Sequence, residues 1–218
     1  MTLHRALRLI VITDSALAAP RTTAEVVEEA LSAGAPAIQL REKGASSREL
    51  MAQAERLREL TTKWNGYFFL NDRFDIALAA GADGVHLGPN DPPVKAIRSA
   101  APEGFLIGHS TDDPAEAREA AAHGADYIGC GAVYPTSTKS DAGTAIGVEG
   151  LAAVARAVEI PVVGIGGITP EGAREIAAGS PAAGVAVIGA VMAASDPGAV
   201  VKALLAPFDE RERARSQQ

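Results

Sequence analysis

Short apolar segments rich in β-branched residues recur along the whole chain. Each one is followed by glycine or polar residues and then by a longer amphipathic stretch. Short apolar runs bounded by turn residues are typical of buried strands, whereas longer stretches with a helical period are typical of helices that cover them. The pattern predicts eight strands, at about residues 8–13, 36–41, 67–71, 84–88, 104–109, 126–132, 161–165 and 184–188.

The segments between these runs are rich in Ala, Glu and Arg, and several begin with helix-capping signals. Ser46 is followed three residues later by Glu49, which is the spacing of a capping box. Thr169 is followed by Pro170, a residue that suits the first turn of a helix. Clear helical stretches run over residues 23–33, 47–64, 113–123 and 148–158.

The repeated strand–helix order predicts an α/β fold with parallel strands. Such strands form either a closed barrel or an open doubly wound sheet. A doubly wound sheet that binds a dinucleotide carries a glycine fingerprint after its first strand, where Thr13, Asp14 and Ser15 stand here. Eight units in 218 residues favour a compact (β/α)8 TIM barrel. We expect a single domain over residues 1–218, with a charged and frayed tail from about residue 207.

Composition narrows the classes of function. A hydrophobic fraction of 47% is typical of globular proteins, and a net charge of -7 argues against general binding of nucleic acid. The apolar run 9–12 is too short for a signal peptide or a membrane span. The single Cys130 cannot form an internal disulfide, so we expect a reducing, cytoplasmic location. The expected partners are small molecules, without nucleic acid or membrane, and the sequence leaves a homo-oligomer open.

The most informative residues stand at the end of the second predicted strand. Side chains of a strand alternate between its two faces, so Gln39, Arg41 and Lys43 share one face, while Leu40 and Glu42 share the other. Two cations and an amide on one side of a strand end are poorly explained as core. They indicate a site that holds an anion.

Two further segments suit phosphate. The glycines 166 and 167, and Gly189 after the eighth strand, allow backbone N–H groups to approach a phosphate, and the loops after strands 7 and 8 are the usual phosphate site of a barrel. The alternative is a tight turn. The segment 136–139, which reads Thr-Ser-Thr-Lys, offers hydroxyls and an ammonium group. The alternative there is a solvated loop.

Two carboxylates, Asp72 and Asp91, end neighbouring predicted strands. Together they suit Mg²⁺, which takes few protein ligands and completes its shell with water and substrate phosphates. Capping of the following helices explains them equally well, because an Asp before Pro92 is a good helix start.

The remaining reactive residues predict no alternative catalytic site. We place His86 in or beside the barrel wall and leave the direction of His109 open. No Cys and His spacing suggests zinc, and Cys130 is expected to be a buried apolar residue. Ser110 lacks the nucleophile elbow of a hydrolase.

Taken in order, these motifs resemble those of the thiamine-phosphate synthase family. The resemblance runs from about residue 8 to 195, and it is carried by the segments 39–43, 71–72, 84–88 with Asp91, 136–139 and 164–168. It implies an enzyme that joins a hydroxymethylpyrimidine diphosphate to a thiazole ethyl phosphate, with Mg²⁺, and releases pyrophosphate. The diphosphate is implied to leave first, giving a pyrimidine methyl cation that the thiazole nitrogen captures.

The resemblance also assigns residues. Arg41, Lys43, Ser110 and Lys139 are implied to be catalytic, and Asp72 and Asp91 to hold Mg²⁺. The pyrimidine diphosphate would be bound by the catalytic four together with Gln39, Leu40, Glu42 and Asn71. The thiazole phosphate would be bound by Thr136, Ser137, Thr138, Gly167, Ile188 and Gly189.

Three positions depart from the family pattern. Pro89 stands where a Gln is frequent, and Gly189 replaces a Ser of the thiazole-phosphate site. Asp112 replaces a His in the loop after the fifth strand. A related barrel, the thiazole tautomerase, uses a His in that loop as its acid and base, so Asp112 argues against tautomerase chemistry. A non-catalytic sensor of phosphorylated ligands is the other alternative, although it would not need to keep the diphosphate-binding residues.

Overall fold

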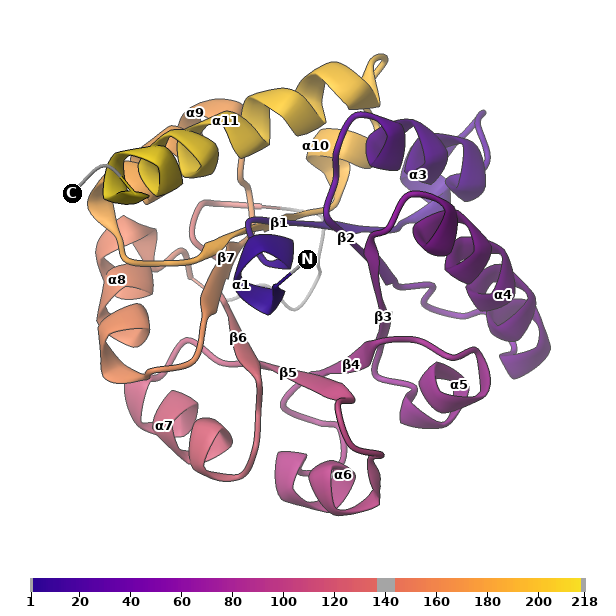
Figure 1. Cartoon of the computed structure of the whole chain (residues 1–218), viewed down its shortest axis with the longest axis horizontal. Helices are drawn as coiled ribbons and strands as arrows, with labels where there is room; N and C mark the ends of the chain where they lie inside the picture. Colours follow the sequence, from indigo (N-terminus) through magenta and orange to yellow (C-terminus); the bar gives the residue numbers. More distant parts are fainter. Residues whose placement is uncertain (1, 137–143, 217–218) are drawn as a thin grey trace.

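Eight parallel strands close into a barrel in the order β1 to β8 (Figure 1). The computed structural model describes residues 2–136 and 144–216. Val11 of the first strand pairs with Ile38 of the second and with Val187 of the last, so the sheet has no free edge. The predicted TIM barrel is confirmed, and the open sheet is excluded. The strands are β1 Leu9–Ile12, β2 Ala37–Leu40, β3 Tyr67–Asn71, β4 Gly84–Leu87, β5 Leu106–Ser110, β6 Tyr127–Cys130, β7 Val162–Ile165 and β8 Gly184–Val187.

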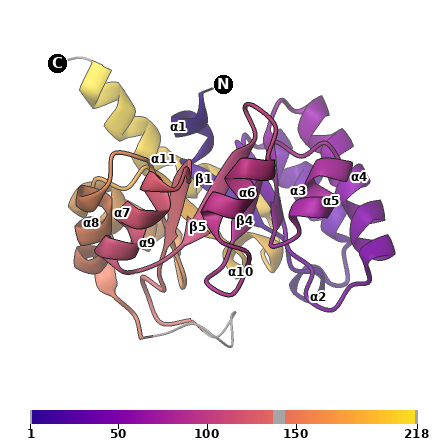
Figure 2. The ribbon, with the colours of Figure 1, turned by 90° about the horizontal axis from the view of Figure 1, so that it is seen from below.

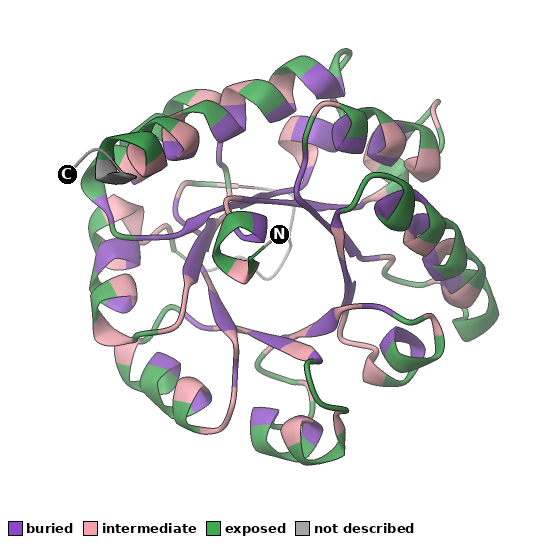
Figure 3. Ribbon diagram, in the orientation of Figure 1, coloured by how far each residue is buried: buried purple, intermediate pink, exposed green. Residues whose placement is uncertain are grey.

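Apart from α1, the helices lie around the outside of the barrel and bury one side against it, as the alternating colours of Figure 3 show. The predicted capping box of Ser46 and Glu49 is present at the start of α4, and Thr169 caps α9 by accepting a hydrogen bond from Gly172 N. The helices are α1 Leu3–Ala6, α2 Ser15–Ala18, α3 Thr23–Ser32, α4 Ser47–Lys63, α5 Phe74–Ala79, α6 Val94–Ala100, α7 Pro114–Ala122, α8 Gly147–Ala157, α9 Pro170–Gly179, α10 Gly189–Met192 and α11 Pro197–Ser216.

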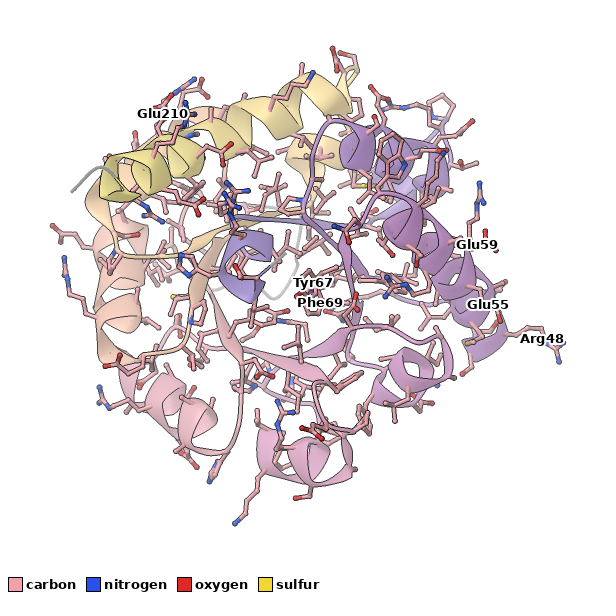
Figure 4. The ribbon with its side chains drawn as sticks, viewed as in Figure 1. Arg48, Glu55, Glu59, Tyr67, Phe69 and Glu210 are labelled. Carbon is pink, nitrogen blue, oxygen red and sulfur yellow. The ribbon has the colours of Figure 1, made fainter. Side chains whose placement is uncertain are left out.

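The strands are buried on both faces, which explains their nearly continuous apolar sequence. In β3, Phe68 and Leu70 are fully buried on the face toward the helices. Tyr67 and Phe69 alternate with them and point to the barrel interior, whereas Glu55 of α4 points to solvent (Figure 4). The interior is therefore filled by side chains, and the positions at the carboxyl ends of the strands are left to line a site.

The amino end of the barrel is closed by α1, while the chain that leaves β6 extends from the opposite end (Figure 2). Two equivalent clamps stabilise the amino end. Asp83 accepts hydrogen bonds from Arg58 at 2.9 Å and from Phe68 N at 2.7 Å. In the same way, Asp126, which precedes β6, accepts hydrogen bonds from Arg98 at 2.5 Å and from Ile107 N at 2.7 Å.

The expectation of a frayed tail from about residue 207 is wrong for residues 207–216, which continue α11. Arg8 bonds to Asp209, and the Arg211 guanidinium donates to the carbonyl oxygens of Ser180 and Ala182 at 3.1 and 2.6 Å. The charged residues Asp209 and Arg211 thus have partners on loops that belong to distant parts of the chain. Among the described residues, no helix combines the length and the apolar character needed to cross a membrane.

Candidate active site

A cavity of about 760 Å³ opens at the carboxyl ends of the strands. It is bounded by strand ends and by the loops that follow them, as expected for a barrel of this type. Most residues singled out from the sequence meet in its lining, although they come from seven different strand ends, those of β2 to β8. These are Arg41, Lys43, Asn71, Asp72, Asp91, Ser110, Thr136, Gly167, Ile188 and Gly189. Ser137, Thr138 and Lys139 lie outside the described residues.

The predicted alternation at the end of β2 decides which residues reach the cavity. Arg41 and Lys43 line it, whereas Leu40 is buried on the opposite face. The Glu42 carboxylate accepts hydrogen bonds from Ser15 N and Ser15 Oγ, at 3.1 and 2.7 Å, so it fastens the loop after β1. Neither Leu40 nor Glu42 belongs to the lining of the cavity, in contrast to the sets that the resemblance implied.

Arg41 is held rigidly although it belongs to a loop. Its backbone N–H donates to Thr13 Oγ1 at 2.9 Å, and the Thr13 hydroxyl donates in turn to the Arg41 carbonyl at 3.3 Å. Arg41 is 8% exposed, so most of its side chain is fixed by packing while it still borders the cavity. A guanidinium held in this way presents a fork of donors suited to phosphate oxygens.

Asp72 and Asp91 do not cap helices, so that alternative is wrong. The residues at the cap positions of α5 and α6 are Arg73 and Pro93, and neither helix receives a side-chain cap. Asp91 Oδ2 instead accepts a hydrogen bond from Gly88 N at 2.7 Å, which directs it over the end of β4. Asp72 has a φ of 63°, a left-handed conformation uncommon outside glycine and often found at functional positions.

The carboxyl groups of Asp72 and Asp91 face each other within hydrogen-bonding contact, and both line the cavity. Burial and the neighbouring Asp91 raise the pKa of Asp72 to about 6, although Lys43 and Arg41 act in the opposite direction. Two like charges held together in this way are unfavourable without a cation. Within the described residues, no third His, Cys, Asp or Glu joins them. A pair of hard oxygen donors beside a phosphate-binding face fits Mg²⁺, which takes one or two carboxylates and otherwise substrate oxygens and water.

The loop after β7 forms a second surface of the cavity from backbone alone. Gly166 and Gly167 have φ values of 98° and 64°, which strongly favour glycine. A Cβ at Gly167 would lie 2.5 Å from the Pro135 carbonyl oxygen, so no larger residue fits without a shift. Gly189 begins α10 after the neighbouring strand β8 and lines the same cavity. Exposed backbone N–H groups at such turns bind phosphate without any cationic side chain.

Three residues of the barrel interior form a hydrogen-bonded row that reaches the cavity, where His86 and Ser110 line its floor. His86 Nε2 lies 2.8 Å from Ser110 Oγ, and His86 Nδ1 lies 3.0 Å from Tyr127 Oη. Gln39 is 2% exposed and bonds to the Tyr127 hydroxyl, so it lies below the main cavity and outside its lining. His86 is thus in the barrel wall as predicted, while the part of Tyr127 was not foreseen.

His109 does not line the cavity. Its Nδ1 atom is buried without a hydrogen-bond partner among the described residues, and burial lowers its pKa. Cys130 is buried as predicted, and burial together with the charge of Asp112 raises the pKa of its thiol to about 12. Neither residue therefore offers acid, base or nucleophile chemistry at the site.

Comparison with known proteins matches residues 9–191 to the family model described as thiamine monophosphate synthase. The chain belongs to the thiamine monophosphate synthase family. It is 47% identical over 196 residues to the thiamine-phosphate synthase of Pyrococcus furiosus, covering 90% of this chain and 92% of the relative. It is 45% identical to that of Moorella thermoacetica, with coverages of 90% and 93%. A solved thiamine phosphate pyrophosphorylase from Pyrococcus furiosus superposes with a TM-score of 0.87 at 43% identity, covering 96% of this chain and 99% of that one.

All three departures from the family pattern face the cavity. Pro89, Asp112 and Gly189 line it, so each changes the wall that a ligand would meet. The sequence reading also missed Thr111 and Glu116 on the same wall, where the Thr111 hydroxyl donates to Glu116 Oε2 at 2.7 Å. Glu116 belongs to α7, and its spacing of five residues from Thr111 matches no motif that would predict a contact between the two side chains. Only the path of the chain after β5 brings the two together.

Proposed function

We propose that this chain is a thiamine-phosphate synthase that joins 4-amino-2-methyl-5-(diphosphooxymethyl)pyrimidine to thiazole ethyl phosphate and releases pyrophosphate. The observation that supports the proposal is that one cavity has two separate surfaces whose chemistry suits anions. Arg41 and Lys43 supply one beside β2, and the glycine turn at Gly166 and Gly167 supplies the other after β7. Figure 1 places β2 and β3 across the barrel from β6 and β7. Two substrates could therefore bind with their phosphate groups on opposite sides of the cavity and their reacting atoms between them.

The diphosphate is assigned to the β2 and β3 side. A departing pyrophosphate gains negative charge in the transition state, and fixed donors aimed at that charge are the largest single source of catalysis in such reactions. Arg41 and Lys43 supply positive charge there, and Asn71 adds an amide beside them. Lys139, which lies outside the described residues, is assigned to the same leaving group.

Asp72 and Asp91 would hold Mg²⁺. Their facing carboxyl groups and the raised pKa of Asp72 support this assignment, because a divalent cation would relieve the repulsion between them. The ion would neutralise the diphosphate and the leaving pyrophosphate. The nearby cations also weaken the repulsion, so the carboxylate pair and the cationic pair complement each other.

The thiazole phosphate is assigned to the β7 and β8 side, with Gly167, Gly189, Ile188 and Thr136 around it. Its ring nitrogen attacks with a lone pair, so the bond-forming step needs no general base. A cavity in which neither His109 nor Cys130 serves as a base suits this chemistry. The contribution of the barrel would then be to orient the two substrates and to exclude water from the reactive pyrimidine cation.

The tautomerase alternative receives no support from the geometry. Asp112 occupies the cavity wall in the loop where that enzyme would carry its His, and His109 lies outside the lining. A cytoplasmic location and small-molecule partners remain part of the proposal, supported by the buried, single Cys130 and the net charge of -7.

The test is product analysis with purified protein, both substrates and Mg²⁺. Formation of thiamine phosphate that requires both substrates supports the proposal. Isomerisation of a thiazole phosphate carboxylate without any thiamine phosphate would replace it by the tautomerase. Tight binding of thiazole phosphate with no turnover of either kind would replace it by the sensor.

A further inference from the structure

The row of Tyr127, His86 and Ser110 connects the barrel interior to the floor of the cavity. The three side chains come from β6, β4 and β5, and the two distances within the row are 3.0 and 2.8 Å. Tyr127 is fully buried, whereas Ser110 borders the cavity. A buried polar group without a hydrogen-bond partner lowers the stability of the folded protein. A row in which each side chain bonds the next avoids that loss and fixes the orientation of its members.

Gly108 and Gly129, which lie in β5 and β6, have no side chains, and the row occupies the space that their side chains would fill. A Cβ at Gly108 would lie 2.2 Å from Tyr127 Cζ and 2.5 Å from His86 Nδ1. A Cβ at Gly129 would lie 2.9 Å from His86 Cε1. Glycine within a strand weakens it and often marks a close approach by another group. Here both glycines make room for the His86 imidazole and its partners.

The row has a direction. The Tyr127 hydroxyl also has a hydrogen bond with the side chain of Gln39. When an amide N–H of Gln39 donates to the Tyr127 oxygen, the Tyr127 proton is left for His86 Nδ1. A neutral imidazole that accepts at Nδ1 carries its proton on Nε2, so His86 donates to Ser110 Oγ.

We propose that Tyr127 and His86 are positioning residues for Ser110, which they hold as a hydrogen-bond acceptor so that its own O–H group is directed into the cavity as a donor to the substrate. The role needs no change of charge on His86. The identity of the ligand, a pyrimidine diphosphate, rests on the proposed function. The direction of the row does not.

A double-mutant cycle tests the connection. Ser110→Ala removes the donor, and we expect kcat/KM for the pyrimidine diphosphate to fall by about tenfold, the effect of one hydrogen bond. Tyr127→Phe keeps the ring and removes the hydroxyl, and we expect a fall of about fivefold with Ser110 present and less than about twofold in the Ser110→Ala background. Tyr67→Phe makes the same chemical change at the amino end of β3 and should leave kcat/KM unchanged. Equal losses from Tyr127→Phe in both backgrounds would overturn the proposal, because a purely structural effect does not depend on Ser110.

The tautomer of His86 tests the direction without any assay of activity. Nitrogen-15 NMR of the four histidines, with the His86 signal identified by its absence in His86→Gln or by sequential assignment, distinguishes protonated from unprotonated ring nitrogens. We expect a neutral ring with its proton on Nε2, and a partial shift to the other tautomer in Tyr127→Phe. A proton on Nδ1 in the unaltered protein would overturn the proposal. A wild-type protein that makes no thiamine phosphate would refute the proposed function while leaving this measurement decisive for the row.

Discussion

The two ends of the barrel use charged residues in opposite ways. At the amino end, Arg58 pairs with Asp83 and Arg98 pairs with Asp126, and each carboxylate also accepts from a strand N–H group. At the carboxyl end, Asp72 faces Asp91, and burial and Asp91 raise the pKa of Asp72 to about 6. The first arrangement stabilises the folded chain, whereas the second is unfavourable until ligands arrive. Charge at the amino end therefore serves stability, and charge at the carboxyl end serves function.

The largest effect is expected for Lys139, which the family resemblance assigns to the diphosphate. Lys139→Ala should lower kcat by about 100-fold or more, because it removes a cation assigned to the leaving pyrophosphate. The affinity for thiazole phosphate should change little. Steady-state kinetics and a binding titration on the same preparation measure both, and equal losses in the two would remove Lys139 from that role.

The clamp at the amino end should show the converse behaviour. Asp126→Ala leaves Arg98 and the Ile107 N–H without their acceptor, so we expect a loss of about 2 kcal/mol in the free energy of unfolding, or about 4–8 °C in Tm. The kcat of the folded fraction should stay within twofold. Glu55→Gln, on the solvent side of α4 (Figure 4), is the matched surface control and should change neither quantity. A large fall in kcat would contradict the division between the two ends.

Asp72→Asn should separate function from stability within a single residue. A carboxyl group whose pKa is raised on folding binds its proton more tightly in the native state, so its ionisation lowers stability as the pH rises from about 4 to about 6. The neutral amide removes this penalty, and we expect Tm at pH 7 without Mg²⁺ to rise or stay the same. The Mg²⁺ concentration for half-maximal activity should rise by about tenfold. An unchanged Mg²⁺ titration would exclude Asp72 from the metal site.

The smallest effect is expected for Glu42, which the family resemblance placed among the substrate-binding residues. The structure ties its carboxylate to Ser15, away from the cavity. Glu42→Gln should therefore change KM for the pyrimidine diphosphate by less than about threefold and the free energy of unfolding by less than about 1 kcal/mol. Arg41→Gln is the matched comparison on the opposite face of the same segment. A Glu42→Gln effect as large as that of Arg41→Gln would show that Glu42 does reach the substrate.

The sequence was sufficient for the barrel because each strand and helix carries its own local signal. Alternation along residues 39–43 also placed Arg41 and Lys43 correctly in the cavity, since neighbouring side chains on a strand point to opposite faces. The frayed tail was predicted wrongly because the partner of Arg211 is a set of backbone carbonyl groups far away in the chain. Tyr127 was missed for a related reason. Its hydroxyl bonds to His86, forty-one positions before it, and to Gln39, which is still farther away in the chain, and no local pattern reveals either partner.

The most direct test of the central claim is the rate of pyrophosphate release by the unaltered protein, measured with the pyrimidine diphosphate, with and without thiazole phosphate, in Mg²⁺ and in EDTA. The account predicts release that requires Mg²⁺, because the facing Asp72 and Asp91 carboxylates would hold the ion beside the leaving group. It also predicts one pyrophosphate for each thiamine phosphate when the thiazole phosphate is present. Release at the same rate in EDTA, or no release from a folded protein that binds thiazole phosphate, would contradict it.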